Sequence, residues 1–323
     1  MKSVKEIPSI LIKERKIQST ISYICRIIVL LAIGFVILYP LFYMITTSLR
    51  SRESFANSVR IWIPDDFAIK ENYKVAIQAL EYGRAIWATL KYQVLSALIQ
   101  VAACSVAAYG FARFNFKFKK VFVALLFVTI LVPDIMLIIP RSVNFSQLDF
   151  FGILGVLSDV FGAELRPNII DTGFVFWLPS LLAAGIKSGI LIFIYIQFFK
   201  GLPQELEEAA WVDGAGPIRT FLSIALPSSG VVILTVTVFS LIWHYNDYLF
   251  SSMYLYNDFP LAVMLETMSS RLGYFGYMMN DKFPEIMAIL MAGCVLFITP
   301  IMIVYIIVQR WFIESIDRVG ITG

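Results

Sequence analysis

Apolar residues gather in six long stretches that polar segments separate. The stretches run approximately over Tyr23–Leu49, Ala85–Phe111, Lys120–Pro140, Gly173–Phe199, Gly230–Met253 and Pro284–Phe312. Because a helix rises about 1.5 Å per residue, about 20 apolar residues cross the hydrocarbon core of a bilayer. In lipid each stretch must satisfy its own backbone hydrogen bonds, which favours helices over open strands. The pattern predicts an all-α polytopic membrane protein with six transmembrane helices.

Composition supports a membrane protein and excludes several other classes. The 323 residues are 59% hydrophobic and only 15% charged, whereas soluble domains are about a quarter charged. A net charge of +3 is too small to indicate a nucleic-acid binder. Three cysteines in apolar runs and a single histidine, His244, indicate neither a disulfide framework nor a metal site nor a catalytic constellation.

The distribution of basic residues predicts the orientation of the chain. The basic residues that carry this signal precede the first stretch or form the short loop after the second: Lys2, Lys5, Lys13, Arg15, Lys16, Arg113, Lys117, Lys119 and Lys120. Such residues are enriched on the cytoplasmic side, and six spans bring both termini to one side. We therefore expect a cytoplasmic N-terminal segment (1–22), a six-span transmembrane domain (23–312) and a cytoplasmic tail (313–323).

Two outer segments are longer than a simple helix bundle requires. The first contains the amphipathic stretch Glu71–Leu80, which predicts a helix lying on the outer surface. The second, over residues 141–172, holds Phe150, Phe151, Leu154 and Leu157, which could form a short interfacial helix.

The segment between the fourth and fifth stretches, residues 200–229, has the strongest local signals and is named the signature loop below. Pro203 suits the first turn of a helix, and the acidic residues that follow it are favoured near the positive end of the helix dipole. Gly214 suits the end of this helix, and Gly216 with Pro217 suits the start of another. The loop predicts a helix–turn–helix at the cytoplasmic membrane surface.

The spacing of residues in this loop resembles a known signature. Glu208-Ala209-Ala210 is followed after three residues by Gly214, after nine more by Ile224, and after one more by Leu226-Pro227. This matches EAA-x3-G-x9-I-x-L-P, the signature of the transmembrane permease subunits of bacterial ABC importers. The match implies the type I permease fold of ABC importers.

The rest of the chain resembles the carbohydrate-uptake branch, and in particular the maltose-type second permease. The residues that carry this likeness are Glu71-Asn72-Tyr73, Trp243 with Asn246-Asp247, and the run Ala288, Pro300 and Gln309–Phe312. Two features depart from the branch. The outer segment 141–172 is longer than usual, and residues 314–323 lack the usual ending of the family.

The resemblance implies a transporter subunit rather than an enzyme. Its partners would be a second permease, two ATP-binding subunits and an extracytoplasmic solute-binding protein, in the bacterial cell (inner) membrane. A sugar would be the substrate, and ATP and Mg would be used by the partners, with no cofactor in this chain. The chain itself has no GxxxxGK[ST] phosphate-binding loop.

In this family the signature loop is a coupling helix that docks on an ATP-binding subunit. The residues that we expect to serve coupling are Glu207, Glu208, Ala209, Ala210, Asp213, Gly214, Ile224, Leu226 and Pro227. The acidic residues offer carboxylates to a partner, the alanines permit close approach, and the glycine permits the turn. The alternative interpretation is an amphipathic surface helix that merely links two spans.

Polar residues inside the apolar stretches are candidates for the substrate pathway, because charge at membrane depth is costly and often functional. These candidates are Lys187, Trp243, His244, Asn246, Asp247 and Tyr248, with Asp134 as a further charged residue. Each has a simpler interpretation. Lys187 could pair with a carboxylate, His244 could be a packing residue, and the aromatic residues could form an interfacial belt.

Two other functions stay open from the sequence. The signature is shared by ABC permeases for amino acids, polyamines or phosphonates. An ion-coupled secondary transporter would need inverted repeats and paired ionisable groups, and the sequence shows neither.

Overall fold

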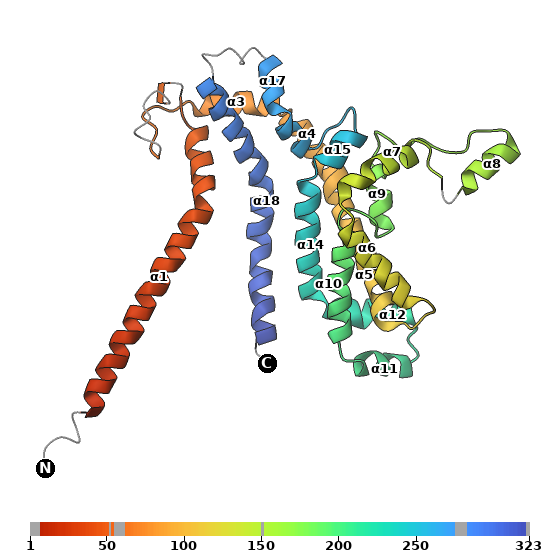
Figure 1. The fold of residues 1–323 in the computed structure, drawn as a ribbon, viewed down its shortest axis with the longest axis horizontal. Helices are drawn as coiled ribbons and strands as arrows, with labels where there is room; N and C mark the ends of the chain where they lie inside the picture. Colours follow the sequence, from red (N-terminus) through yellow and green to blue (C-terminus); the bar gives the residue numbers. More distant parts are fainter. Residues whose placement is uncertain (1–6, 52, 55–61, 150–151, 275–282, 321–323) are drawn as a thin grey trace. The chain divides into compact units, whose positions relative to one another are not determined.

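The computed structural model describes residues 7–51, 53–54, 62–149, 152–274 and 283–320 (Figure 1). Within these ranges the regular structure is helical, with one isolated antiparallel bridge between Arg50 and Phe67. The predicted all-α class is therefore confirmed for the described residues. The chain forms two compact units, one of residues 1–76 and 277–295 and the other of residues 77–276 and 296–323.

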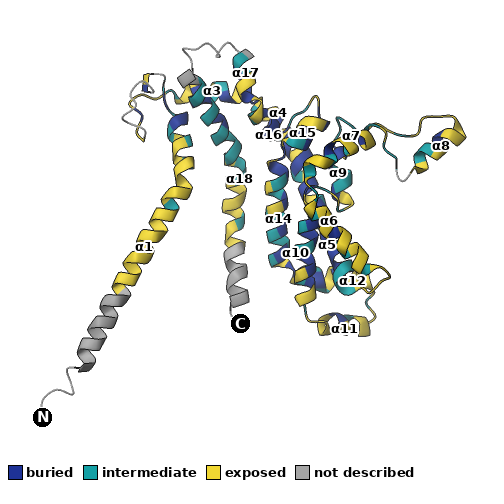
Figure 2. Cartoon of the chain, in the orientation of Figure 1, coloured by how far each residue is buried: buried dark blue, intermediate teal, exposed yellow. Residues whose placement is uncertain are grey.

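The first unit contains α1 (Ile7–Ser48), the greater part of α3 (Ile69–Ala79) and the start of α18 (Phe283–Gly320). Helix α1 begins well before the predicted span, inside the expected N-terminal segment. Its stretch Thr20–Ser48 has a mean hydropathy of 2.6 and is long enough to cross a membrane. Most of its side chains are exposed (Figure 2). An exposed apolar helix of this length is typical of contact with lipid.

Helix α3 is the predicted amphipathic surface helix, and Asn72 fixes it to the end of α1. The Asn72 amide nitrogen donates to the carbonyl oxygens of Ser48 at 3.0 Å and Arg50 at 2.9 Å. The hydroxyl of the next residue, Tyr73, lies 3.0 Å from Ser48 Oγ. These bonds satisfy carbonyl groups that the end of a helix leaves without partners.

The second unit is built around one long helix. It runs without a break through α4 (Tyr82–Ala88), a π-helical turn η1 (Thr89–Val94) and α5 (Leu95–Arg113). Helix α5 packs against α10 (Ser188–Gly201) and α14 (Gly230–Tyr245), as Figure 1 shows. The core they share holds Cys104 and Ala108 against Leu191, Tyr195 and Val236. Small residues on α5 let the neighbouring helices approach closely.

Three of the six predicted stretches are interrupted. Helix α6 (Lys119–Leu131) stops before Pro133, and the chain turns by 101° into η2 (Asp134–Leu137) and α7 (Ile138–Ser146). The fourth stretch is divided into α9 (Phe174–Leu181) and α10, and the fifth into α14 and α15 (Leu249–Tyr254). Three described helices are long and apolar enough to cross a membrane, or five if each bent pair is one span. The count of six stays a prediction.

The causes of the interruptions are local. Pro133 has no N–H, and the residue before a proline disfavours helical geometry. Between α9 and α10, Ala183 and Lys187 have positive φ angles of 53° and 52°, which a helix does not allow. A continuous Lys187-containing helix was expected, but Lys187 lies at the break where α10 begins.

The outer segment 141–172 contains α8 (Ile153–Phe161), which carries Leu154 and Leu157 as predicted. The expected contribution of Phe150 and Phe151 lies outside the described residues. Two further helices of this unit, α16 (Leu261–Glu266) and α17 (Met268–Tyr274), follow α15 in the chain.

Asp171 connects the end of this outer segment to the turn after α15. Its N–H donates to the Tyr254 carbonyl at 2.8 Å. Its carboxylate accepts the N–H groups of Tyr256 at 2.7 Å and Asn257 at 3.2 Å, and it also accepts the Asn257 side-chain amide. Partial burial opposes ionisation, but these hydrogen bonds outweigh it and hold the pKa of Asp171 below its ordinary value.

We predict that Asp171→Ala speeds hydrogen exchange in residues 254–258, because two backbone N–H groups lose their acceptor. In the unchanged protein the lowered pKa keeps the hydrogen bonds of Asp171 formed at neutral pH, and protection is lost only as the pH falls through this lowered pKa, below about 4. Mass-resolved exchange measures both effects. Glu164→Ala, which removes an exposed carboxylate of the same outer segment, should leave residues 254–258 unaffected. Equal exchange in the Asp171 variant and the unchanged protein would contradict this role.

Candidate coupling surface and transport groove

The signature loop folds as the predicted helix–turn–helix. Helix α11 (Glu205–Val212) is followed by a turn at Gly214, whose φ of +81° is strained for any residue with a side chain. Pro217 then starts α12 (Pro217–Thr220), which continues through a π-helical turn η3 (Phe221–Ala225) into α13 (Leu226–Ser228). An 82° bend separates this second arm from α14.

One face of the loop presents carboxylates beside large apolar side chains. Glu208 and Asp213 are exposed, as are Ala209 and Gly214, and Ala210 is half-buried. Leu206 and Trp211 are each 48% exposed and Val212 is 87% exposed. Exposed apolar groups rimmed by charge are typical of a surface that binds another protein. We name this face, formed by α11 and Gly214, the coupling surface.

Glu207 does not belong to the coupling surface, although the sequence pattern suggested that it would offer its carboxylate to a partner. Its side chain is 4% exposed and accepts a hydrogen bond from Arg113 Nε at 2.8 Å, with Arg113 itself 5% exposed. The Tyr109 hydroxyl donates to the same carboxylate at 3.2 Å, and Arg113 Nη2 donates to the Leu202 carbonyl at 2.8 Å. We name Tyr109, Arg113 and Glu207 the α5–α11 clamp, because they join α11 to the end of α5.

The second half of the signature lies away from the coupling surface. Ile224 is half-buried in the π-helical turn, and Leu226 packs against the core around α5 and α10. Pro227 lies in α13, near the end of the continuous arm Pro217–Ser228, where it has no N–H to donate to the preceding turn. These three residues shape the arm that returns to α14.

The candidate pathway residues gather on one groove in the second unit. An open surface groove is lined by Asp134, Lys187, Trp243, Asn246, Asp247 and Tyr248. Asp134 and Lys187 also line a neighbouring cavity. The side chains come from η2, from the start of α10, and from the end of α14 and the turn before α15. The breaks in the three interrupted stretches therefore create the groove.

The polar groups of the groove differ in how many hydrogen bonds they already make within the chain. Lys187 Nζ lies 5.0 Å from the centre of the Trp243 ring, a cation–π distance. Among the described side chains no carboxylate lies within ion-pair distance of this ammonium group. Asp247, in contrast, accepts the N–H groups of Phe250 and Ser251, each at 3.1 Å, and it caps α15.

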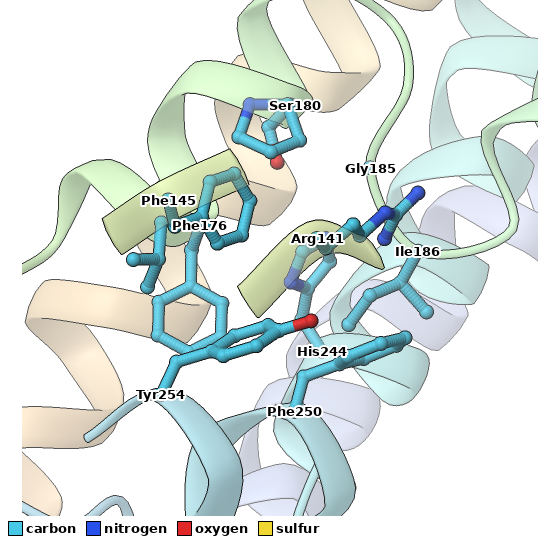
Figure 3. Close-up of a pocket in the computed structure, with 11 residues that line it drawn as sticks. Arg141, Phe145, Phe176, Ser180, Gly185, Ile186, His244, Phe250 and Tyr254 are labelled. Atoms are coloured by element: carbon cyan, nitrogen blue, oxygen red, sulfur yellow. The ribbon is translucent and has the colours of Figure 1, made fainter. Parts of the chain in front are cut away.

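His244 lies behind the groove rather than in it. Both of its ring nitrogens contact glutamine side chains, Gln93 at 3.2 Å and Gln100 at 2.9 Å. Its ring also borders a smaller inner cavity, which Figure 3 shows among Phe176, Ser180, Phe250 and Tyr254. Sequence reasoning overlooked Gln93 and Gln100. The sequence feature that could have revealed them is a pair of amide side chains seven residues apart in an apolar stretch. This spacing places both on one face of a helix.

An all-helical chain with membrane-length apolar helices and an exposed helix–turn–helix of this signature defines an integral membrane permease subunit. Residues 15–318 match the family described as the binding-protein-dependent transport system inner membrane component. The chain belongs to this family, whose members are permease subunits of ABC transporters rather than enzymes.

Known relatives and a solved structure agree with this assignment. The chain is 25% identical to the melibiose/raffinose/stachyose import permease protein MelC of Bacillus subtilis, over 92% of this chain and 97% of that protein. It is also 25% identical to the arabinooligosaccharides transport system permease protein AraQ of Halalkalibacterium halodurans, over 90% and 93% of the two chains. A chain from a bacterial ABC transporter for the acidic polysaccharide alginate shares the fold, with a TM-score of 0.67, 19% identity, and coverage of 91% and 98%.

We predict that breaking the clamp destabilises the protein more than removing an exposed carboxylate. Glu207→Ala leaves the Arg113 guanidinium buried without its partner, which costs about 3 kcal/mol or more. Glu205→Ala, two residues away on the exposed face of the same helix, should change stability by less than about 0.5 kcal/mol. Thermal or denaturant unfolding of the purified protein measures the difference. Equal stability of the two variants would show that the pair does not hold α11.

Proposed function

We propose that this chain forms part of the translocation pathway of an ATP-driven importer for a sugar or oligosaccharide. One observation carries the proposal: the complete family signature stands on an exposed, rigidly anchored helix–turn–helix. MelC and AraQ match this chain over nearly its full length, and both are named as permeases for oligosaccharides. Their names support the substrate class.

The coupling surface is proposed to dock on an ATP-binding subunit. Glu208 and Asp213 supply carboxylates to basic groups or N–H groups of that subunit, while Trp211 and Val212 supply apolar contact. Ala209 and Ala210 keep the helix close to its partner, and Gly214 makes the turn that directs the second arm back to α14. Because the clamp holds α11 against α5, closure of the ATP-binding subunits moves the helix bundle as a rigid body.

The assembly needs further subunits. Two ATP-binding subunits supply ATP and Mg chemistry, a second permease completes the pathway, and an extracytoplasmic solute-binding protein delivers the sugar. The N- and C-termini are proposed to be cytoplasmic in a bacterial inner membrane, which places the signature loop on the same side as ATP. The division into residues 1–22, 23–312 and 313–323 follows this topology.

The groove is proposed as this subunit's contribution to the sugar pathway. Trp243 and Tyr248 offer aromatic faces against which a pyranose ring can stack. Lys187, Asn246 and Asp134 offer donors and acceptors for hydroxyl groups. Asp247 and His244 serve the groove from behind, because their polar atoms are already bonded within the chain.

We predict that Glu208→Lys and Gly214→Asp uncouple ATP hydrolysis from uptake. The first reverses a charge on the coupling surface, and the second forces a side chain into a left-handed turn. Uptake by the reconstituted importer should fall by about tenfold or more, while membrane insertion and ATP hydrolysis persist.

Glu164→Lys makes the same charge change in the outer segment 141–172 and should leave uptake unaffected. Normal uptake in both signature-loop variants would overturn the proposed coupling role.

A further inference from the structure

A buried set of amide and imidazole groups lies directly behind the groove. Gln93 and Gln100 are fully buried on the long helix of the second unit, and His244 of α14 is buried between them. We name these three residues the bracket. Burying a polar side chain costs free energy unless it is hydrogen-bonded. The hydrogen-bond partners of these three side chains therefore show which segments they hold in place.

Gln100 holds the turn that carries Lys187. Its Nε2 donates to the Ile186 carbonyl and to Ser188 Oγ, both at 2.7 Å, so the residues on either side of Lys187 are fixed. Lys187 has a positive φ of 52°, which is costly for a side chain of this size and persists only where neighbours impose it. The two bonds from Gln100 supply that constraint.

Gln93 holds the turn that carries Asn246 and Tyr248. Its Nε2 donates to Ser251 Oγ at 2.6 Å and lies 3.4 Å from Asp247 Oδ2. Asp247 stands between Asn246 and Tyr248 in the sequence. His244 in turn follows Trp243. Lys187, Trp243, Asn246 and Tyr248 of the groove therefore each stand next in sequence to a residue that belongs to the bracket or is held by it.

The contacts also indicate which ring nitrogen of His244 is the donor. The Ile186 carbonyl can only accept, so Gln100 must point its amide nitrogen at Ile186 and its oxygen at the other side. That oxygen accepts from Ser240 Oγ at 2.8 Å and faces His244 Nε2 at 2.9 Å. Gln93 Oε1 faces His244 Nδ1 at 3.2 Å, and a neutral ring can donate to only one of the two amide oxygens. The shorter contact, to Gln100, favours the donor at Nε2, and a side chain that keeps a donor at this point can replace His244.

The helix that carries the two glutamines also carries the α5–α11 clamp. Arg113 follows Gln100 by 13 residues, which is about 20 Å along the helix. The end of this helix therefore holds the coupling helix through Glu207, and its middle holds both walls of the groove.

We propose that Gln93, Gln100 and His244 are positioning residues that tie the groove to the long helix formed by α4, η1 and α5, so that the groove moves with the coupling surface. This inference rests on the proposed function of the groove and of the signature loop. None of the three residues needs to touch the sugar. Their effect is exerted through the backbone on either side of the groove residues.

The test measures the groove directly and needs no substrate. Tyr248→Cys places a thiol in the groove, and its rate of reaction with N-ethylmaleimide is read by mass spectrometry at that residue. The importer is assembled with its ATP-binding subunits and is compared without nucleotide and when trapped with ADP and vanadate. With the bracket intact, the reaction rate should change about fivefold or more between the two states.

Bracket variants are then added to Tyr248→Cys. Gln100→Leu and His244→Asn should remove the dependence on nucleotide, since the first deletes the bonds and the second cannot place a donor at the Nε2 position. His244→Gln, which does place one there, should restore it. Gln147→Leu, an exposed glutamine of the outer segment 141–172, is the matched control and should behave like the unchanged bracket.

The outcomes test the proposed function and the role of the bracket separately. Absence of any nucleotide dependence in Tyr248→Cys alone, or failure to assemble with ATP-binding subunits, overturns the proposed function. Dependence that survives in Gln100→Leu and His244→Asn overturns the bracket, and so does equal behaviour of the His244→Gln and His244→Asn variants. Nucleotide dependence that returns in His244→Gln but not in His244→Asn would exclude a general packing role for His244.

Discussion

A buried ion pair at one end of α5 is the interaction on which the rest of this permease depends. Arg113 and Glu207 meet at 2.8 Å with almost no exposure to solvent, and Tyr109 adds a third group to the same carboxylate. A surface ion pair would give α11 little stability. Burial makes the loss of either partner costly, so the coupling surface is held in one position relative to the helix bundle.

A second constraint acts within the membrane, where polar groups must find partners inside the protein. Helix breaks at Pro133, at Lys187 and after Tyr245 expose backbone groups. The side chain of Gln100 satisfies one such group beside Lys187, and that of Asp247 satisfies two at the start of α15. Irregular backbone at membrane depth is tolerated where it lines a cavity. The interrupted helices and the groove are therefore two aspects of one arrangement.

Local signals predicted the helical elements well. The apolar stretches, the helix–turn–helix, the turn at Gly214 and the amphipathic helix at Glu71–Leu80 all follow from residues near one another in the chain. The helix break at Lys187 was missed because the residue that imposes it, Gln100, is distant in sequence. The burial of Glu207 was missed for the same reason. The local sequence does not distinguish Glu205, Glu207 and Glu208, and only the fold brings Arg113 to Glu207.

The central claim is that the chain works as one permease of an ATP-driven importer. Gentle purification from its native membrane, followed by mass identification and reconstitution into vesicles, tests this most directly. The account predicts that an ATP-binding subunit and a second polytopic permease co-purify, and that uptake requires ATP. A chain that purifies alone and transports alone, without ATP, would contradict it.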